Sequence, residues 1–123
     1  MNPINIAVDA MGGENSPNKV IKGIEIHSKD NKNIFYNIFG DCNKIETTIK
    51  KTKIPSNLYK IIHTQNYIED TDSPLSAAKK GKDTSMWLSI QSLKDNQSDA
   101  IVSAGNTGAL FVIAKLNLKM IDK

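Results

Sequence analysis

Apolar residues along the chain fall into two kinds of run, and the two kinds alternate. Runs of the first kind are short and rich in β-branched or aromatic side chains, which is typical of buried strands. Runs of the second kind place apolar residues three and four positions apart, which is the spacing of one helical face. The pattern predicts strands at 4–9, 34–40, 58–64 and 100–105, helices at 18–28, 43–51, 83–95 and 107–121, and a short helix or helical turn at 72–81.

The predicted helix starts carry residues that suit a helix cap. Pro17 fits the first turn of the first helix, and Ser16 before it can cap that helix. The segment 72–74, with its Asp-Ser-Pro sequence, has the same cap-like character, and Gly81 ends the helical turn that it opens.

The alternation of strands and helices predicts the fold class. Strands followed by helices in this order imply an α/β protein of parallel β-α-β units, with a sheet covered on both faces. In open sheets of this kind, ligands bind at the carboxyl ends of the strands. The loops that leave the first, third and fourth predicted strands, at 10–17, 63–74 and 104–108, all belong to that edge.

Amino-acid composition disfavours some classes of binding partner and some kinds of ligand site. The 123 residues suffice for one domain or part of one, and the net charge of +3 comes from scattered lysines, which disfavours nucleic-acid binding. There is no arginine, so an anion site must use lysine charges, backbone N–H groups or arginine from another chain. The single cysteine, Cys42, fits packing better than catalysis and indicates a reducing cytosol. No apolar run approaches the roughly 20 residues that span a bilayer.

Two stretches leave a predicted strand through glycines, IAVDAMGGENSP at 6–17 and IVSAGNTGAL at 101–110. Glycine lets the backbone approach a ligand closely, and the helix that follows points unpaired N–H groups and the positive end of its dipole at the same place. Phosphate is the natural ligand of such a turn. The residues that supply room or donors are Gly12, Gly13, Asn15 and Ser16 in the first turn, and Gly105, Asn106, Thr107 and Gly108 in the second.

Other interpretations of these features stay open. Neither turn matches the dinucleotide or P-loop patterns, which disfavours a nucleotide, and both turns could need glycine for geometry alone. Asp9, at the end of the first strand, suits a cap, a base or a metal ligand. The lysines near position 80 form either a solvated face or an anion site, and His63 is either structural or functional. No residue spacing fits zinc, and no nucleophile elbow is present.

Three motifs together resemble a known family. IAVDAMGGENSP (6–17), DSPLSAAKKGKDTSM (72–86) and SDAIVSAGNTGAL (98–110) are similar, in order and spacing, to the bacterial phosphate acyltransferase of phospholipid synthesis, or acyl-carrier-protein:phosphate transacylase. The resemblance implies transfer of a fatty acyl group from an acyl carrier protein thioester to inorganic phosphate. The product, an acyl phosphate, would be used by a membrane glycerol-3-phosphate acyltransferase. It also implies a cytoplasmic homodimer that contacts the membrane surface, a fold like isocitrate and isopropylmalate dehydrogenases, and no cofactor or metal.

The family's functional positions carry over to the matching residues. The family's pattern is kept at Asp9, Gly12, Gly13, Asn15 and Pro17, at Lys82, Asp83, Ser85 and Met86, and at Ser103, Gly105, Asn106, Thr107 and Gly108. Among these we expect phosphate or substrate binding at Asp9, Gly12, Gly13, Asn15, Lys82, Ser85, Gly105 and Thr107, and catalysis at Asn106 and Ser103. The chain departs from the family at Glu14 and Ser16, where aspartate and alanine are usual, at Lys79 and Lys80, where two arginines are common, and at Gly81, which replaces a basic residue. It covers about the first third of such an enzyme, so 1–123 is expected to be an incomplete N-terminal segment.

For the complete enzyme the resemblance and the turns lead to one mechanistic hypothesis. Phosphate sits on backbone N–H groups of the glycine turns with help from Lys82, and attacks the thioester without a covalent enzyme intermediate. Asn106 or Ser103 donates to the oxyanion, a contact typically worth about 2.7–4 kcal/mol. At Gly105 we expect a positive φ or a close approach to the ligand. The alternatives are a non-catalytic remnant or partner-binding half, and an acyltransferase that uses coenzyme A thioesters.

Overall fold

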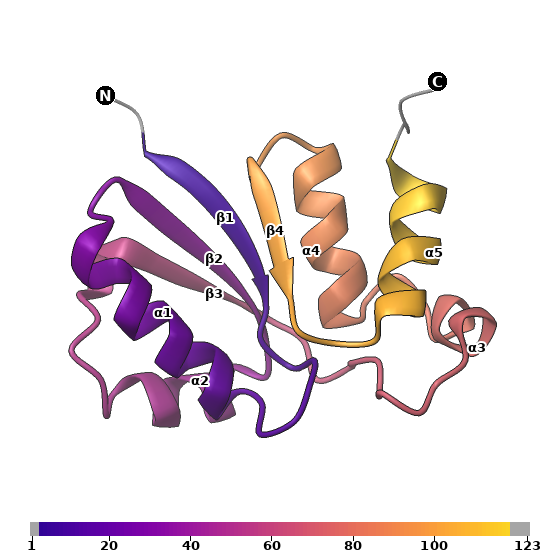
Figure 1. Cartoon of the computed structure of the whole chain (residues 1–123), viewed down its shortest axis with the longest axis horizontal. Coiled ribbons are helices and arrows are strands. Elements are labelled where there is room, and N and C mark those ends of the chain that lie inside the picture. Colours follow the sequence, from indigo (N-terminus) through magenta and orange to yellow (C-terminus); the bar gives the residue numbers. More distant parts are fainter. Residues whose placement is uncertain (1–2, 119–123) are drawn as a thin grey trace.

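The chain folds around a four-stranded, fully parallel sheet with the strand order β3-β2-β1-β4 (Figure 1). The computed structural model describes residues 3–118. The strands are β1 (Ile4–Asp9), β2 (Ile34–Gly40), β3 (Tyr59–His63) and β4 (Ala100–Ser103). The helices are α1 (Asn18–Asp30), α2 (Cys42–Ile49), the 3₁₀ turn η1 (Ser56–Leu58), α3 (Pro74–Lys79), α4 (Ser85–Lys94) and α5 (Thr107–Asn117). The predicted α/β class and parallel β-α-β units are confirmed.

Helices cover the two faces of the sheet in separate groups. In Figure 1, α1 and α2 lie on one side of the sheet, and α4 and α5 lie on the other. This division follows from right-handed crossovers, since the chain moves from β1 toward β3 through α1 and α2 and then returns past β1 to β4 through α4. Each group has its own core, centred on Ile21, Ile38 and Ile45 for the first and on Met86, Ile90 and Ile113 for the second.

The face of α4 that meets the sheet is lined with small polar residues. Ser85, Ser89 and Ser92 are buried at helical spacing, and the hydroxyls of Ser89 and Ser92 donate to carbonyls within the same helix, at 2.7 Å each. Buried Asn37 of β2 donates to the Ser98 hydroxyl at 2.9 Å. Small side chains let α4 lie close to β1. Ser89 and Ser92 donate within the helix and Ser85 donates to Asp9 of β1, so all three buried hydroxyls have an acceptor.

The helix starts agree with the sequence prediction at one place and differ at another. Ser73 caps α3 as expected, accepting from the backbone N–H of Ser76 at 3.1 Å. The expected cap at Ser16 is wrong, because its hydroxyl donates to the carbonyl of Gly12 and Pro17 occupies the cap position of α1 without a side-chain bond. The predicted continuation of the last helix through 119–121 lies outside the described residues. Within residues 3–118, no helix is long and apolar enough to cross a bilayer.

Candidate functional site

The buried carboxylate of Asp9 joins three elements at the carboxyl edge of the sheet. Its Oδ1 accepts from the Ser85 hydroxyl at 2.6 Å and from the Met11 backbone N–H at 3.2 Å. Its Oδ2 accepts from the Ser103 hydroxyl at 3.0 Å. Asp9 is only 2% exposed, so these donors stand in for the water that a carboxylate loses on burial. Asp9 therefore holds β1, the start of α4 and the end of β4 together.

Ser103 extends this network into the second glycine turn. Strand register places it beside Asp9, and its Oγ accepts from the Gly105 N–H at 3.2 Å while its hydroxyl donates to Asp9. Of the predicted site residues, Asp9, Ser85, Ser103 and Gly105 are thus brought into one chain of hydrogen bonds. This chain fixes the direction in which the backbone leaves β4.

The two glycine turns touch each other through their backbones. A Cβ added to Gly12 would lie 2.8 Å from the Cα of Gly105, and one added to Gly13 would lie 2.8 Å from the carbonyl oxygen of Ala104. Gly13 has a φ of +87°, whereas Gly105 is not among the glycines with positive φ. Of the two alternatives expected at Gly105, the positive φ is therefore wrong, and the close approach to a ligand stays a prediction. The close approach found at Gly105 is to Gly12, so these glycines have a packing role in the structure.

Asn106 ties the second turn to the 63–74 loop. Its Oδ1 caps α5 by accepting from the Ala109 N–H at 3.1 Å. Its Nδ2 donates to the carbonyl oxygens of Asp72 at 2.6 Å and of Glu69 at 3.3 Å. Both ends of the amide are engaged, so Asn106 positions α5 and the loop. Sequence reasoning selected Asn106 for catalysis and missed these carbonyl acceptors, because no local pattern marks a contact across 34 residues.

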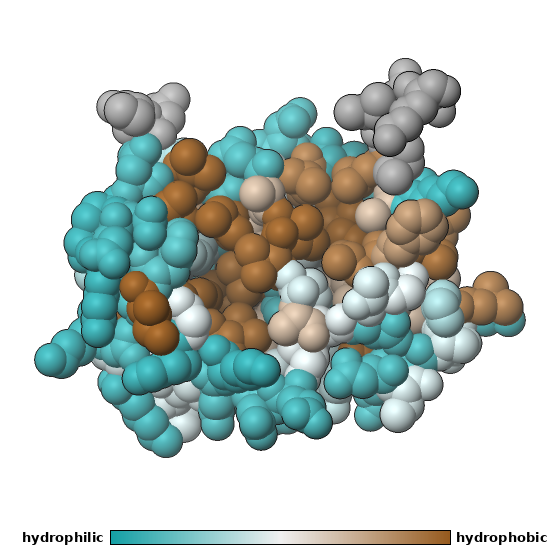
Figure 2. All heavy atoms as spheres, viewed as in Figure 1, coloured by the Kyte–Doolittle hydropathy of each residue, from teal (hydrophilic) through white to brown (hydrophobic). Residues whose placement is uncertain are grey.

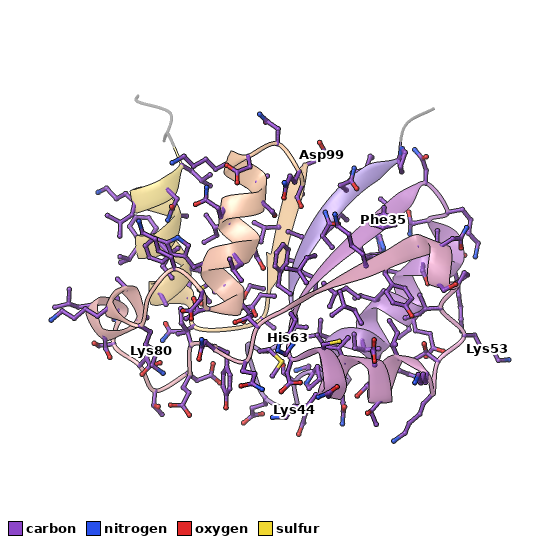
Figure 3. All side chains as sticks on the ribbon, turned by 180° about the vertical axis from the view of Figure 1, so that it is seen from behind. Phe35, Lys44, Lys53, His63, Lys80 and Asp99 are labelled. Atoms are coloured by element: carbon purple, nitrogen blue, oxygen red, sulfur yellow. The ribbon has the colours of Figure 1, made fainter. Side chains whose placement is uncertain are left out.

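The middle lysine of the 79–82 cluster pairs with the same loop. Lys80 Nζ lies 2.7 Å from Asp72 Oδ2 and 3.7 Å from Glu69 Oε2. The Lys80 ammonium and then the Glu69 N–H hold the pKa of Asp72 below its usual range, and the bond to Asp72 raises the pKa of Lys80. Figure 3 shows Lys80 beside α3. In residues 3–118, Lys82 is exposed and makes no hydrogen bond or ion pair.

Both turns carry unpaired backbone donors, and the first turn carries more of them. Among the described residues, no hydrogen bond is found for the N–H groups of 12–16, nor for those of 106–108 at the start of α5. The side chains of Asn15 and Thr107 are exposed and have no hydrogen-bond partner within the part of the chain described. Unpaired N–H groups at a glycine turn and at a helix start can bind an anion.

His63 and Cys42 form a separate structural contact at the end of β3. The Cys42 backbone N–H donates to His63 Nδ1 at 3.0 Å, so the imidazole accepts at the start of α2. Desolvation, and then the neighbouring Glu46 and Asp41, raise the pKa of the Cys42 thiol. A raised pKa lowers the thiolate fraction and thus the nucleophilicity of the sulfur. In residues 3–118, no group of three or more His, Cys, Asp or Glu side chains is arranged to hold a metal ion.

Known proteins match this chain along almost its whole length. The model of the family described as fatty acid synthesis protein matches residues 4–123. A phosphate acyltransferase of Pelagibacter ubique is 60% identical over 119 residues, which are 97% of this chain and 35% of the relative. Phosphate acyltransferases of Streptococcus mutans and Listeria welshimeri are 41% and 44% identical over 96% of this chain and 35% of each relative.

The chain spans about a third of the length of these curated relatives, and the three motifs of the site lie within the matched part. The extent of the match covers every described strand and helix, including both glycine turns. The chain therefore belongs to the fatty acid synthesis protein family.

Proposed function

We propose that this chain carries the phosphate-handling edge of an acyltransferase that moves a fatty acyl group from acyl carrier protein to inorganic phosphate, giving an acyl phosphate for phospholipid synthesis. The observation that carries the proposal is the set of unpaired N–H groups in the turn 12–16, beside the buried Asp9 network. Relatives named phosphate acyltransferase support it. We further propose 1–123 as an N-terminal segment of that enzyme.

Phosphate in this proposal binds to backbone N–H groups rather than to arginine, which the chain lacks. The turn 12–16 supplies most donors, with the side chain of Asn15 and the start of α5 at Thr107 adding others. The exposed ammonium of Lys82 adds a positive charge from the loop before α4. Asp9 does not contact the anion, because its oxygens are occupied by Ser85, Ser103 and Met11. It holds the two turns in place instead.

The chemical step needs no covalent enzyme intermediate. A phosphate oxygen attacks the thioester carbonyl, a C–O bond forms, the C–S bond breaks, and the departing thiolate takes the proton that the hydrogen phosphate gives up. An oxyanion develops on the carbonyl oxygen and needs preorganised donors. Asn106 and Ser103 are the proposed donors, although in this structure their hydrogens go to the carbonyls of the 63–74 loop and to Asp9. Substrate binding must therefore free one of these hydrogens, or a backbone N–H must serve.

The proposed partners follow from the same reaction. They are an acyl carrier protein thioester, inorganic phosphate, a second copy of the enzyme, and a membrane glycerol-3-phosphate acyltransferase that takes the product. The proposed location is the cytoplasm, with contact to the inner face of the cell membrane. A coenzyme A thioester is the alternative acyl donor.

A second candidate function is a non-catalytic half that binds a partner polypeptide. It is favoured by one observation, that the hydrogens of the proposed oxyanion donors Asn106 and Ser103 already go to the 63–74 loop and to Asp9. The two candidates differ in whether the chain supplies working site residues to an assembled enzyme.

The experiment joins this chain to the part of the Pelagibacter relative that it does not span, as one fused polypeptide. The assay measures acyl phosphate release from acyl carrier protein and coenzyme A thioesters as a function of phosphate concentration. We expect phosphate-dependent release, faster with acyl carrier protein. A soluble fusion that gives no acyl phosphate with either donor contradicts the proposal. Release of acyl phosphate from coenzyme A thioesters alone would identify coenzyme A, and not acyl carrier protein, as the carrier of the acyl group.

A further inference from the structure

An open apolar groove lies on the face of the sheet that carries α1. It has a volume of about 390 Å³ and is lined by Ile6 and Val8 of β1, Val102 of β4, and Val20, Gly23 and Ile24 of α1. Val102 is 54% exposed. Figure 2 shows apolar surface gathered in the middle of this view, over the sheet between α1 and α5. A valine on a sheet face is normally covered, so the exposure requires an explanation.

The elements described here do not close the groove. Parallel sheets are buried on both faces. The opposite face of β4 is covered, because Ile101 packs against the core cluster that contains Ala109 and Ile113 of α5 and residues of α4. On the near face, α1 packs over β1 and β2 and leaves the strip from β1 to β4 open. Because α5 already lies on the far face, the chain through residue 118 has no element left for this strip.

We propose that the groove between α1 and β4 is the docking site for the apolar face of a helix from the part of the family's polypeptide that this chain does not span. The occupant is argued from length, since about two thirds of each relative lies outside the match. Helix-in-groove packing needs an apolar trough and close approach at small residues. Gly23 offers that approach, because a Cβ added there would meet nothing within 4 Å.

The rim of the groove constrains the partner's chemistry. Lys19 and His27 of α1 lie along the α1 side of the groove, and His27 Nδ1 is hydrogen-bonded to the Tyr36 hydroxyl at 2.6 Å. A helix with an apolar face and an acidic residue toward Lys19 fits best. The inference does not depend on the proposed reaction, because it concerns packing of the polypeptide, and its test measures binding rather than turnover.

The first experiment is complementation in two pieces. This chain is co-expressed with the remaining part of the Pelagibacter relative as a separate tagged polypeptide, and the amount of chain retained with the tag is measured. We expect a one-to-one complex that Val102→Lys weakens by on the order of tenfold or more, as for a buried interface position. The matched control is Ile26→Lys on the outer face of α1, which is 60% exposed and outside the groove, and which should bind as the unchanged chain does.

The second experiment reads accessibility at the groove itself. In a Cys42→Ser background, a thiol reagent labels Val102→Cys or Ile26→Cys, first in the chain alone and then in the complex or in the fused polypeptide. We expect the partner to slow labelling at 102 by on the order of tenfold or more, as burial within a docked helix requires, and to leave 26 unchanged.

Four results contradict the proposal. They are equal binding by Val102→Lys and the unchanged chain, undiminished labelling at 102 in the complex, protection at 102 by a second copy of this chain alone, and protection by dodecanoate without the partner. The third result assigns the groove to a homodimer, and the fourth assigns it to an acyl chain. Failure of both the two-piece and fused forms to yield a soluble assembly also counts against it.

Discussion

The two glycine turns at the carboxyl edge look alike in sequence and are built differently. The second turn is short, and most of it is engaged: the Gly105 N–H donates to Ser103, and Asn106 both caps α5 and holds the 63–74 loop, which leaves the N–H groups of 106–108 unpaired among the described residues. The first turn is longer, has left-handed residues at Gly13 and Asn15, and starts α1 without a side-chain cap. Its N–H groups from 12 to 16 have no partner among the described residues.

This difference indicates that the second turn mainly positions its neighbours and that the first turn is the better candidate for binding a ligand. A turn whose side chain and glycine N–H are used orients neighbouring elements and has fewer donors left for a ligand. A turn with unpaired donors needs either water or an anion. The two turns meet at Gly12 and Gly105 and share Asp9, so the second one fixes the position of the first.

The largest expected effect comes from separating the turns at their contact. Gly12→Ala places a methyl group 2.8 Å from the Gly105 Cα, and backbone cannot yield as a flexible side chain does. We expect the free energy of unfolding to fall by about 3 kcal/mol, at the upper end of overpacking costs. Urea unfolding measures it. The matched control, Gly23→Ala in α1, meets open space and should stabilise by about 0.5–1 kcal/mol. Equal stabilities for the two variants would disprove the contact.

The next effect comes from the carboxylate that both turns share. Asp9→Asn keeps the shape but replaces one accepting oxygen by an NH₂ group that faces existing donors. We expect a loss of about 2 kcal/mol, in the range for hydrogen bonds to a charged group. Asp30→Asn at the exposed end of α1 is the control and should change stability by less than about 0.5 kcal/mol. An Asp9→Asn variant as stable as the unchanged chain would mean that the charge is not needed.

A smaller effect distinguishes the two roles of Asn106. Asn106→Ala removes the cap of α5 and the bonds to the loop, whereas Asn106→Ser keeps an oxygen that can cap. We expect Asn106→Ala to cost about 1–2 kcal/mol and Asn106→Ser about half as much. Thermal unfolding of the two variants measures the difference. If serine is as damaging as alanine, the bonds to the loop carry the whole effect and the cap carries none.

The smallest effect is the pH dependence of the Lys80–Asp72 pair. Because the pKa of Asp72 is lowered on folding, its contribution is present above its ordinary value of 3.8 and is lost as pH falls through the lowered pKa. The raised pKa of Lys80 acts oppositely, and its contribution is lost as pH rises past its ordinary value of 10.5 and through the raised value. Asp72→Asn should therefore narrow the stability difference between pH 7 and pH 3. If the free energy of unfolding of Asp72→Asn and of the unchanged chain depends on pH in the same way, this expectation is contradicted.

The sequence predicted the fold well because each element carries its own periodicity. The ends of the strands differ from the predicted ranges by at most two residues. Helix α3 is capped by Ser73 and is followed by Gly81 with a positive φ, as the residue types at these positions predict. The site was less predictable. Residue types at its edge were identified, but the use of Gly12 and Gly105 for mutual packing, and of Asn106 for two carbonyls, depends on contacts between segments far apart in the chain. No local pattern encodes such contacts.

In the proposed function, the first turn holds phosphate through its backbone N–H groups. The most direct measurement is a titration of the ¹⁵N-labelled chain with inorganic phosphate, followed through the amide resonances, with chloride at matched ionic strength as the control. We expect saturable chemical-shift changes at the N–H groups of residues 12–16, smaller ones at 106–108, and none at 59–63 in β3. Shifts that appear equally with chloride, or that are confined to exposed lysines while 12–16 stay unchanged, would contradict it.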